Sequence, residues 1–468
     1  MSRLIVISNR VAMPTGAKSP GGLAVGVYDA LRDSGGIWLG WNGETVAGHA
    51  DTPLSTTTQD NITYATFPLA QQEYDRFYRG FSNAVLWPVF HYRPDLGRYR
   101  RGDYEGYLQV NRHFAQRLAP LLRPDDVIWV HDYHLLALGG YLREMGVRNH
   151  IGFFLHIPFP NAEVFKTIPP YQALAQAMCA YDVAGFQTAA DARAFSDCCV
   201  QFAGADREAG GLRTGERRVR VGTYPIGIDV DDVARMAQAR RSRQVAALKA
   251  GAVDLKLVIS VDRLDYSKGL LERFAAFEQL LEIEPAHRGR VSFVQLAPPS
   301  RSDVHGYREI RRELDRAAGR INGKWGELGW TPLRYINRAY ERATLMPLLR
   351  AAQVGLVTPL RDGMNLVAKE YMAAQAPEDP GVLVLSQFAG AACEMEDGAL
   401  IVNPYDSEGM ARTLSRALHM PLAERIERYQ QLLQGLRTHD LAAWKNRFLA
   451  DLRGVTASAA SEPPAMPA

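Results

Sequence analysis

The chain of 468 residues has little cysteine and no long apolar run. Its four cysteines, Cys179, Cys198, Cys199 and Cys393, have neither the spacing of metal ligands nor the density of a disulfide scaffold. No stretch approaches the roughly 18 apolar residues of a membrane-spanning helix, and the apolar run at 4–7 is too short for a secretion signal. These absences exclude disulfide-rich secreted proteins and helical membrane proteins, and they favour a reducing, cytoplasmic location.

The chain also lacks an excess of charge of either sign. Its 54 basic and 51 acidic side chains leave a formal net charge of +3. Proteins that bind nucleic acids usually carry a clearly basic surface, so the composition argues against a nucleic-acid partner. Any anion must therefore be bound by a local group of cations.

Short β-branched runs alternate with amphipathic stretches, which predicts parallel sheets with right-handed crossovers. The runs form two successive sets: Leu4–Ile7, Val127–Val130, Ile151–Leu155 and Val183–Phe186, then Leu255–Val261, Val291–Leu296, Val354–Val357 and Val382–Leu385. The length suits two domains of roughly 200 residues each. We therefore expect an α/β protein with Rossmann-like domains at 1–232 and 233–456 and a disordered tail at 457–468.

Three segments outside these runs also have interpretable patterns. The stretch 231–249, rich in Ala, Arg and Gln, is typical of a surface helix joining two domains. The glycine-rich, charged stretch 203–220 predicts an exposed loop. In 441–452, Trp444 and Phe448 share one helical face, so this helix is expected to pack back on the first domain.

Ligands of open α/β sheets bind beyond the carboxyl ends of the strands, so the residues after each run are the candidates. In the first half these include Arg10, a Gly21-Gly22 turn, and His156. The segment from His131 to His134, which includes Asp132, fits either a metal site or buried histidines held by hydrogen bonds, and its spacing lacks a defined ligand geometry.

In the second half, Arg361–Glu370 follows a buried strand and predicts a tight turn at Gly363 and a helix from Leu366. A helix start offers free N–H groups and a positive dipole end to an anion, and Glu370 lies about one turn inside. This is the layout of a nucleotide-sugar site.

Cations follow other strands of the second half. Arg263 and Lys268 come after Leu255–Val261 and can together neutralise a diphosphate, and Arg301 lies beyond Val291–Leu296. The Asp-x-Asp spacing at 229–231 occurs in metal-dependent glycosyltransferases, but its place between the domains favours a helix N-cap.

Several segments together resemble one known family. The matching segments are Ile7–Arg10, Gly21–Leu23, Phe81–Trp87, Trp129–His134, the stretch at His156, Asp262–Gly269, Val354–Glu370, Leu383–Gly390 and Ile401–Tyr405. The chain resembles the family of trehalose-6-phosphate synthases, retaining glucosyltransferases of glycosyltransferase family 20 with the GT-B fold. That fold has two Rossmann-like domains whose parallel sheets face a central cleft.

The resemblance implies transfer of glucose from a nucleoside diphosphate glucose to glucose 6-phosphate, with acceptor binding in the first domain and donor binding in the second. UDP-glucose is the favoured donor, although the sequence leaves the nucleobase open. The implied acceptor residues are Arg10, Trp41, Tyr78, Trp87, Asp132 and Arg301. The implied donor residues are Gly22, His156, Arg263, Lys268, Tyr340, Asp362, Gly363, Met364, Asn365, Leu366, Val367 and Glu370. The implied catalytic residues are Arg263, Lys268, Asp132, His156 and Asp362.

Retention by double displacement would need a carboxylate nucleophile beneath the sugar. The resemblance assigns other partners to the carboxylates: Glu370 to the ribose, Asp132 to the acceptor side and Asp362 to donor hydroxyls. This favours a front-face route in which the departing phosphate oxygen takes the acceptor proton, while Arg263 and Lys268 offset the charge on the diphosphate.

This route needs neither metal nor cofactor. By resemblance we also expect a homodimer or homotetramer, and a separate trehalose-6-phosphate phosphatase acting on the product. Two alternatives stay open: a related synthase with another acceptor, and a non-catalytic sugar-phosphate sensor.

Overall fold

The computed structural model describes residues 2–11, 22–48, 53–238, 245–246, 255–300 and 305–459. The chain divides into two compact units. Unit 1 comprises Met1–Pro225 with Ala442–Ala468, and unit 2 comprises Ile226–Leu441. The division at 225/226 comes a few residues before the expected boundary at 232/233.

Helix α9 (Val230–Ala237) explains where the division falls. It packs against α13 (Arg342–Ala351) and α14 (Leu366–Ala374), so it belongs to unit 2 rather than to a free connector. Asp229 caps its first turn, because the Asp229 carboxylate accepts a hydrogen bond of 2.8 Å from the backbone N–H of Asp232. The N-cap predicted for the Asp-x-Asp segment is confirmed.

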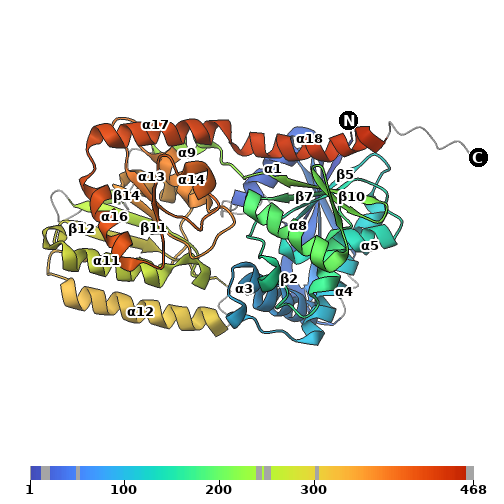
Figure 1. The fold of residues 1–468 in the computed structure, drawn as a ribbon, viewed down its shortest axis with the longest axis horizontal. Coiled ribbons are helices and arrows are strands. Elements are labelled where there is room, and N and C mark those ends of the chain that lie inside the picture. The colour runs from blue at the N-terminus through green and yellow to red at the C-terminus, as the bar shows by residue number, and fades with distance from the viewer. Residues whose placement is uncertain are drawn as a thin grey trace, which may run out of the picture. The chain divides into compact units, whose positions relative to one another are not determined.

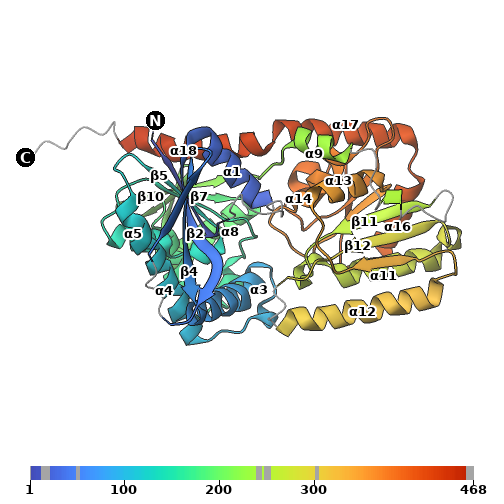
Figure 2. The ribbon, with the colours of Figure 1, turned by 180° about the vertical axis from the view of Figure 1, so that it is seen from behind.

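The described part of unit 1 contains one sheet of ten strands in the order β3-β4-β2-β1-β5-β6-β7-β10-β9-β8. The strands are β1 (Leu4–Arg10), β2 (Gly36–Val46), β3 (Ser55–Gln59), β4 (Ile62–Ala70), β5 (Val127–His131), β6 (Ile151–Phe154), β7 (Val183–Phe186), β8 (Asp206–Glu208), β9 (Gly211–Thr214) and β10 (Arg217–Thr223). From β4 to β10 the pairing is parallel, and the outer pairs at both edges are antiparallel. Figure 2 shows β2 and β4 from behind.

The prediction of an exposed loop at 203–220 is wrong. This stretch forms most of the antiparallel edge made by β8, β9 and β10. Its glycines act at the reversals, where Gly210 and Gly215 adopt φ values of +79° and +60° that other residues rarely take. Charged side chains on a short edge strand discourage pairing with other molecules, which explains why the strands resemble a loop in sequence.

Helices accompany the sheet of unit 1, and a long π-helical segment, η1 (Tyr74–Leu86), follows β4. The helices are α1 (Gly22–Ser34), α2 (Gln71–Glu73), α3 (Trp87–Phe90), α4 (Arg101–Leu118), α5 (Leu138–Glu144), α6 (Ala162–Phe165), α7 (Tyr171–Met178), α8 (Ala189–Ala203) and α18 (Leu441–Ala459). Among the described helices of the whole chain, none combines the length and apolarity needed to cross a membrane.

Helix α18 completes the core of unit 1. The rings of Trp444 and Phe448 contact the buried ring of Trp129 in β5, with centroid separations of 5.0 and 4.9 Å. Glycines in the neighbouring strands make room for this helix. A Cβ at Gly152 or Gly185 would lie 2.8 or 2.7 Å from the Phe448 ring, which is too close for any side chain.

In unit 2 the described residues form a wholly parallel sheet of six strands in the order β13-β12-β11-β14-β15-β16. The strands are β11 (Lys256–Val261), β12 (Val291–Leu296), β13 (Leu333–Ile336), β14 (Val354–Val357), β15 (Val382–Ser386) and β16 (Leu400–Val402). The further helices are α11 (Leu270–Ile283), α12 (His305–Trp325), α15 (Ala392–Met395), α16 (Ser407–His419) and α17 (Leu422–Thr438). Figure 1 shows these strands between α11 on one side and α13 and α14 on the other, the doubly wound arrangement of a Rossmann-like unit.

Candidate active site

Polar residues gather at the carboxyl edge of the unit 1 sheet. Strands β1, β5 and β6 are parallel neighbours, so the residues that end or follow them share this edge. Arg10 ends β1, Asp132 follows β5, and His156 follows β6. Three residues predicted for the site therefore lie along this one edge of the sheet, as expected for residues that end or follow parallel strands.

Asp132 has an unusual backbone conformation, with φ +75° and ψ 167°. Its N–H donates to the carbonyl of Phe154 at 2.8 Å, and its carboxylate accepts a hydrogen bond of 3.3 Å from the N–H of His156. A non-glycine residue at positive φ costs of order 1–3 kcal/mol, so its surroundings must fix this conformation. The carboxylate of Asp132 is thereby held next to His156.

An aromatic group covers the same edge. The Arg10 guanidinium lies 5.8 Å from the Trp41 ring centroid, and Trp41 contacts Tyr78 at 6.0 Å. Tyr78, on η1, stacks on His134 with an angle of 8° between the ring planes. Trp87 is nearly fully buried and packs against the Tyr133 ring at 5.7 Å. These aromatic rings form an aromatic wall beside the cation Arg10.

His131 and His156 contact each other directly, with 3.0 Å between His131 Nδ1 and His156 Nε2. Burial lowers the pKa of His156 to about 3 and holds the pKa of His131 well below its usual range. Both rings are therefore neutral at pH 7. The sequence left two interpretations open for this segment, a metal site or buried histidines held by hydrogen bonds. The second describes His131.

The carboxyl edge of the unit 2 sheet carries a second polar group. Strands β11 and β14 are neighbours, and the loops that follow them bring Lys268 and Asp362 into an ion pair. Asn365 donates through Nδ2 to Asp262 at 3.3 Å and to Asp362 at 3.0 Å. Arg263 is exposed in the same loop as Lys268.

Helix α14 begins at this edge without a side-chain cap. Its N-cap residue, Asn365, makes no side-chain hydrogen bond to the first turn, because its amide is held by the two carboxylates. Within the described part of the chain, the first N–H groups of α14, at Leu366 and Val367, are thus left for another acceptor, and the helix dipole favours an anion. The predicted helix start at Leu366 is confirmed, and anion binding at it stays a prediction.

The turn before α14 bends at Gly363 as predicted, and it also contains a left-handed residue that was not predicted. The left-handed residue is Asn365, with φ +73°, and Gly363 does not have positive φ. Close packing still governs this turn, since a Cβ at Gly390 would lie 1.8 Å from the carbonyl oxygen of Gly363. The buried Met364 is held through its carbonyl by the N–H of Ala391 at 2.8 Å.

Glu370 lies one turn into α14 and is bound to Arg342. Arg342 Nη2 is 3.1 Å from a Glu370 carboxylate oxygen, and Nη1 is 3.6 Å from Asp232 on α9. Burial raises the pKa of Glu370, and the ion pair with Arg342 offsets this only in part. Tyr340 lies two residues before Arg342, with its ring centroid 5.8 Å from the Arg338 guanidinium.

Sequence reasoning missed Arg273, which is fully buried beneath the site. It donates to Asp262 at 2.7 Å, to Thr358 Oγ1 at 3.0 Å and to the carbonyl of Lys268 at 2.7 Å. One guanidinium therefore joins the loops after β11 and β14. Its signal in the sequence is an arginine among the mostly apolar residues of 270–281.

Two predicted positions have limited description. Arg301 lies outside the described residues, so its role stays a prediction. Gly22 begins α1, and the residues before it from 12 to 21 are likewise outside the described part of the chain.

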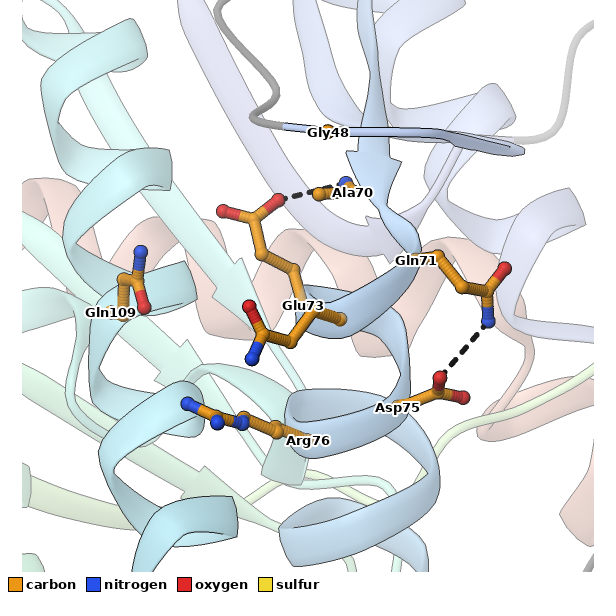
Figure 3. Close-up of a pocket in the computed structure, with 8 residues that line it drawn as sticks. Gly48, Ala70, Gln71, Glu73, Asp75, Arg76 and Gln109 are labelled. Carbon is orange, nitrogen blue, oxygen red and sulfur yellow. Dashed lines mark hydrogen bonds between the residues drawn. The ribbon is translucent and has the colours of Figure 1, made fainter.

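A separate cavity of about 590 Å³ follows β4 in unit 1 (Figure 3). It is lined by Gly48, Ala70, Gln71, Gln72, Glu73, Asp75, Arg76 and Gln109. Although burial alone would raise the pKa of Glu73, hydrogen bonds from His113 and the Ala70 N–H lower it. The lining includes none of the residues predicted for the active site.

Known proteins resemble the chain over nearly its whole length. The model of glycosyltransferase family 20 matches residues 8–454. A curated trehalose-6-phosphate synthase of Cronobacter sakazakii is 52% identical, with 97% of this chain and 96% of that protein covered.

Two solved structures show the same fold. The UDP-forming α,α-trehalose-phosphate synthase of Burkholderia vietnamiensis is 57% identical, with a TM-score of 0.95 and 99% of each chain covered. The enzyme of that type from Burkholderia xenovorans, solved with glucose-6-phosphate, is 53% identical, with a TM-score of 0.92 and 97% of this chain and 100% of that chain covered. The α/β class and the GT-B fold expected from the sequence are confirmed, and the chain belongs to glycosyltransferase family 20.

Proposed function

We propose that the protein is a retaining glucosyltransferase that moves glucose from UDP-glucose to glucose 6-phosphate, giving α,α-trehalose 6-phosphate and UDP. The observation that carries this proposal is the Lys268–Asp362 pair beside the uncapped start of α14, a site suited to a diphosphate. Membership of the family supports glycosyl transfer, and the names of the two Burkholderia proteins support UDP and glucose 6-phosphate.

Unit 2 binds the donor. Arg263 and Lys268 neutralise the diphosphate, and the first N–H groups of α14 donate to its oxygens. Glu370, kept in place by Arg342, accepts hydrogen bonds from the ribose hydroxyls. The other donor contacts are those of Tyr340 with the base, of Asp362 and His156 with the glucose, and of Gly22 and 363–367 through the backbone or close packing.

Unit 1 binds the acceptor. The phosphate of glucose 6-phosphate is bound by Arg10, Tyr78, Trp87 and Arg301. Trp41 and Asp132 line the sugar. The wall of aromatic rings around Arg10 supports this role, because stacked rings hold a cation and a sugar face in a fixed geometry.

The chemistry proceeds on one face of the glucose. As the bond to the diphosphate breaks, Arg263 and Lys268 stabilise the negative charge that develops on the leaving oxygen. That oxygen takes the proton from the acceptor hydroxyl, which attacks the anomeric carbon from the same side. Asp132, Asp362 and Glu370 each have a protein partner, which supports a route without a carboxylate nucleophile. Because two cations supply the positive charge, the reaction is metal-independent.

The test mixes the purified protein with UDP-glucose and glucose 6-phosphate, with and without a chelator. We expect UDP release in both arms and a product whose NMR spectrum shows two α-linked glucose units. A β-linkage would overturn retention, and loss of turnover with the chelator would overturn metal independence. ADP-glucose and GDP-glucose in parallel report the preference for the base.

The alternative enzyme would release UDP only with another phosphorylated acceptor, which product mass identifies. A sensor would bind glucose 6-phosphate and release no UDP. The proposal extends to a cytoplasmic homo-oligomer, dimer or tetramer, whose product is consumed by a separate trehalose-6-phosphate phosphatase. Light scattering of the purified chain tests the oligomeric state.

A further inference from the structure

His131 is a fully buried histidine to which the proposed reaction gives no role. It ends β5, beside β6 and the segment that carries His156. The two imidazole rings lie at 25° with centroids 5.3 Å apart, and their nearest nitrogens, His131 Nδ1 and His156 Nε2, are 3.0 Å apart. Since both rings are neutral, one nitrogen donates a proton and the other accepts it.

The surroundings of His131 decide which ring donates. Among the described residues, His131 Nε2 has no hydrogen-bond partner, and it is buried. The rings in contact with His131 are Trp129, Phe154 and Trp444. The polar atoms of these side chains are the two indole N–H groups, which are buried and likewise unpaired within the described part of the chain.

A proton on His131 Nε2 would therefore add a third buried donor that has no acceptor within hydrogen-bond distance among the described residues. An unsatisfied buried N–H costs about 1–3 kcal/mol, whereas an unprotonated nitrogen is attracted by the neighbouring indole N–H dipoles. The favoured tautomer of His131 carries its proton on Nδ1. His131 then donates to His156 Nε2, and the single proton of His156 must lie on its Nδ1.

We propose that His131 is a positioning residue that fixes the tautomer of His156, so that His156 presents an Nδ1–H donor to the transferred glucose. The contact between His156 and the glucose rests on the function proposed above, whereas the tautomer does not. A second hydrogen bond, donated by the backbone N–H of His156 to the Asp132 carboxylate, fixes the backbone of the same residue. Together they leave the ring with one orientation and one hydrogen-bonding polarity.

The tautomer is tested first, on the ligand-free protein with ¹⁵N-labelled histidine. Long-range ¹H–¹⁵N correlation spectra distinguish protonated Nδ1 from protonated Nε2, and the spectra of H131N and H156Q assign the two rings. We expect Nδ1–H on both. An Nε2–H on either ring would overturn the proposal whether or not the protein transfers glucose.

The consequence for activity is tested with three substitutions of His131. Two of the new side chains have nearly equal shapes, and the third keeps a ring. His131→Asn keeps an amide that can donate to His156 Nε2 from the Nδ1 position. His131→Asp offers only an acceptor there, and His131→Phe keeps a ring without either. We expect His131→Asn to stay within about threefold of the parent, and the other two to lose tenfold or more in turnover, as wrong tautomers do.

The KM for glucose 6-phosphate should be unchanged in all three variants, because Arg10 and the aromatic wall are intact. Melting temperatures identify any variant that fails to fold, and His131→Asn against His131→Asp remains the decisive pair. Equal activity of these two variants would overturn the proposal. If the parent protein itself shows no transfer, the proposed function fails while the tautomer measurement still stands.

Discussion

Lys268 and Asp362 form an ion pair although 94 residues separate them in the chain. The two side chains are only 9% and 13% exposed, so the carboxylate holds the ammonium group with little access of water. An ion pair in this setting fixes Lys268 at the position where the donor diphosphate is proposed to bind. The pair is the basis of the first prediction.

Lys268→Ala and Arg263→Ala should each lower turnover about 10²-fold or more, the scale of losing a group that stabilises developing charge. Steady-state kinetics with UDP-glucose and glucose 6-phosphate measure the effect. Lys324→Ala is the matched control, since Lys324 is an exposed cation paired with Glu282 on the surface of unit 2 and should have no effect. Near-normal turnover in either active-site variant would refute the electrophilic role.

Arg273→Met should destabilise the protein by about 3–5 kcal/mol, because it leaves Asp262 buried without its ion pair. Urea unfolding measures the change. The double variant Arg273→Met with Asp262→Asn removes both charges and should recover part of the loss. If the loss of unfolding free energy in the double variant exceeded the sum of the losses in the two single variants, repair of the unpaired charge would not be the explanation.

Gly390→Ala should weaken UDP binding, because its Cβ would collide with the Gly363 carbonyl and displace the turn before α14. Calorimetric titration with UDP measures the affinity, for which we expect a loss of tenfold or more. Gly323→Ala serves as the control. It lies within α12 with nothing within 4 Å of its added Cβ, so it should leave UDP binding unchanged and stabilise the helix by about 0.5–1 kcal/mol. Equal UDP affinities of the two variants would contradict the close-packing argument.

Acid should destabilise the protein through His156. Its pKa is about 3 in the folded state against 6.5 for an ordinary histidine, so the unfolded chain binds a proton as the pH falls through 6.5 and the folded one does not. Stability is therefore fully present above pH 6.5 and is lost as the pH falls below it. For one histidine the loss between pH 7 and pH 5 is about 2 kcal/mol.

His156→Gln should reduce the difference in unfolding free energy between pH 7 and pH 5 by that amount. Urea titrations at both pH values measure it. Above pH 7.5 the variant and the parent should respond to pH alike. A variant that keeps the full acid sensitivity of the parent would show that His156 is not the group responsible.

The sequence was sufficient where burial is continuous along a strand. The runs at Val183–Phe186, Val291–Leu296 and Val354–Val357 became strands with the same bounds, because a parallel strand covered on both faces needs a largely apolar segment. Strands β2 and β4 were not predicted. Glycines interrupt β2, and threonines interrupt β4, so neither has such a run.

In the site, the rule of strand ends located Lys268, Asp362 and Asp132, because it depends only on where strands stop. It did not locate Arg273, whose partners Asp262 and Thr358 are assembled by the fold. The left-handed turn residue was also out of reach. The bend at Gly363 was predicted, but the left-handed conformation of Asn365, whose amide is held by two carboxylates, was not.

The place of α18 in the chain has a consequence for biosynthesis. Trp444 and Phe448 cover Trp129, yet the ribosome makes them only after the whole of unit 2 has been translated. Unit 2 is continuous in sequence and can close its core while still tethered. Until α18 has been made, the apolar indole surface of the first unit stays uncovered. Chaperones would be needed most during that interval.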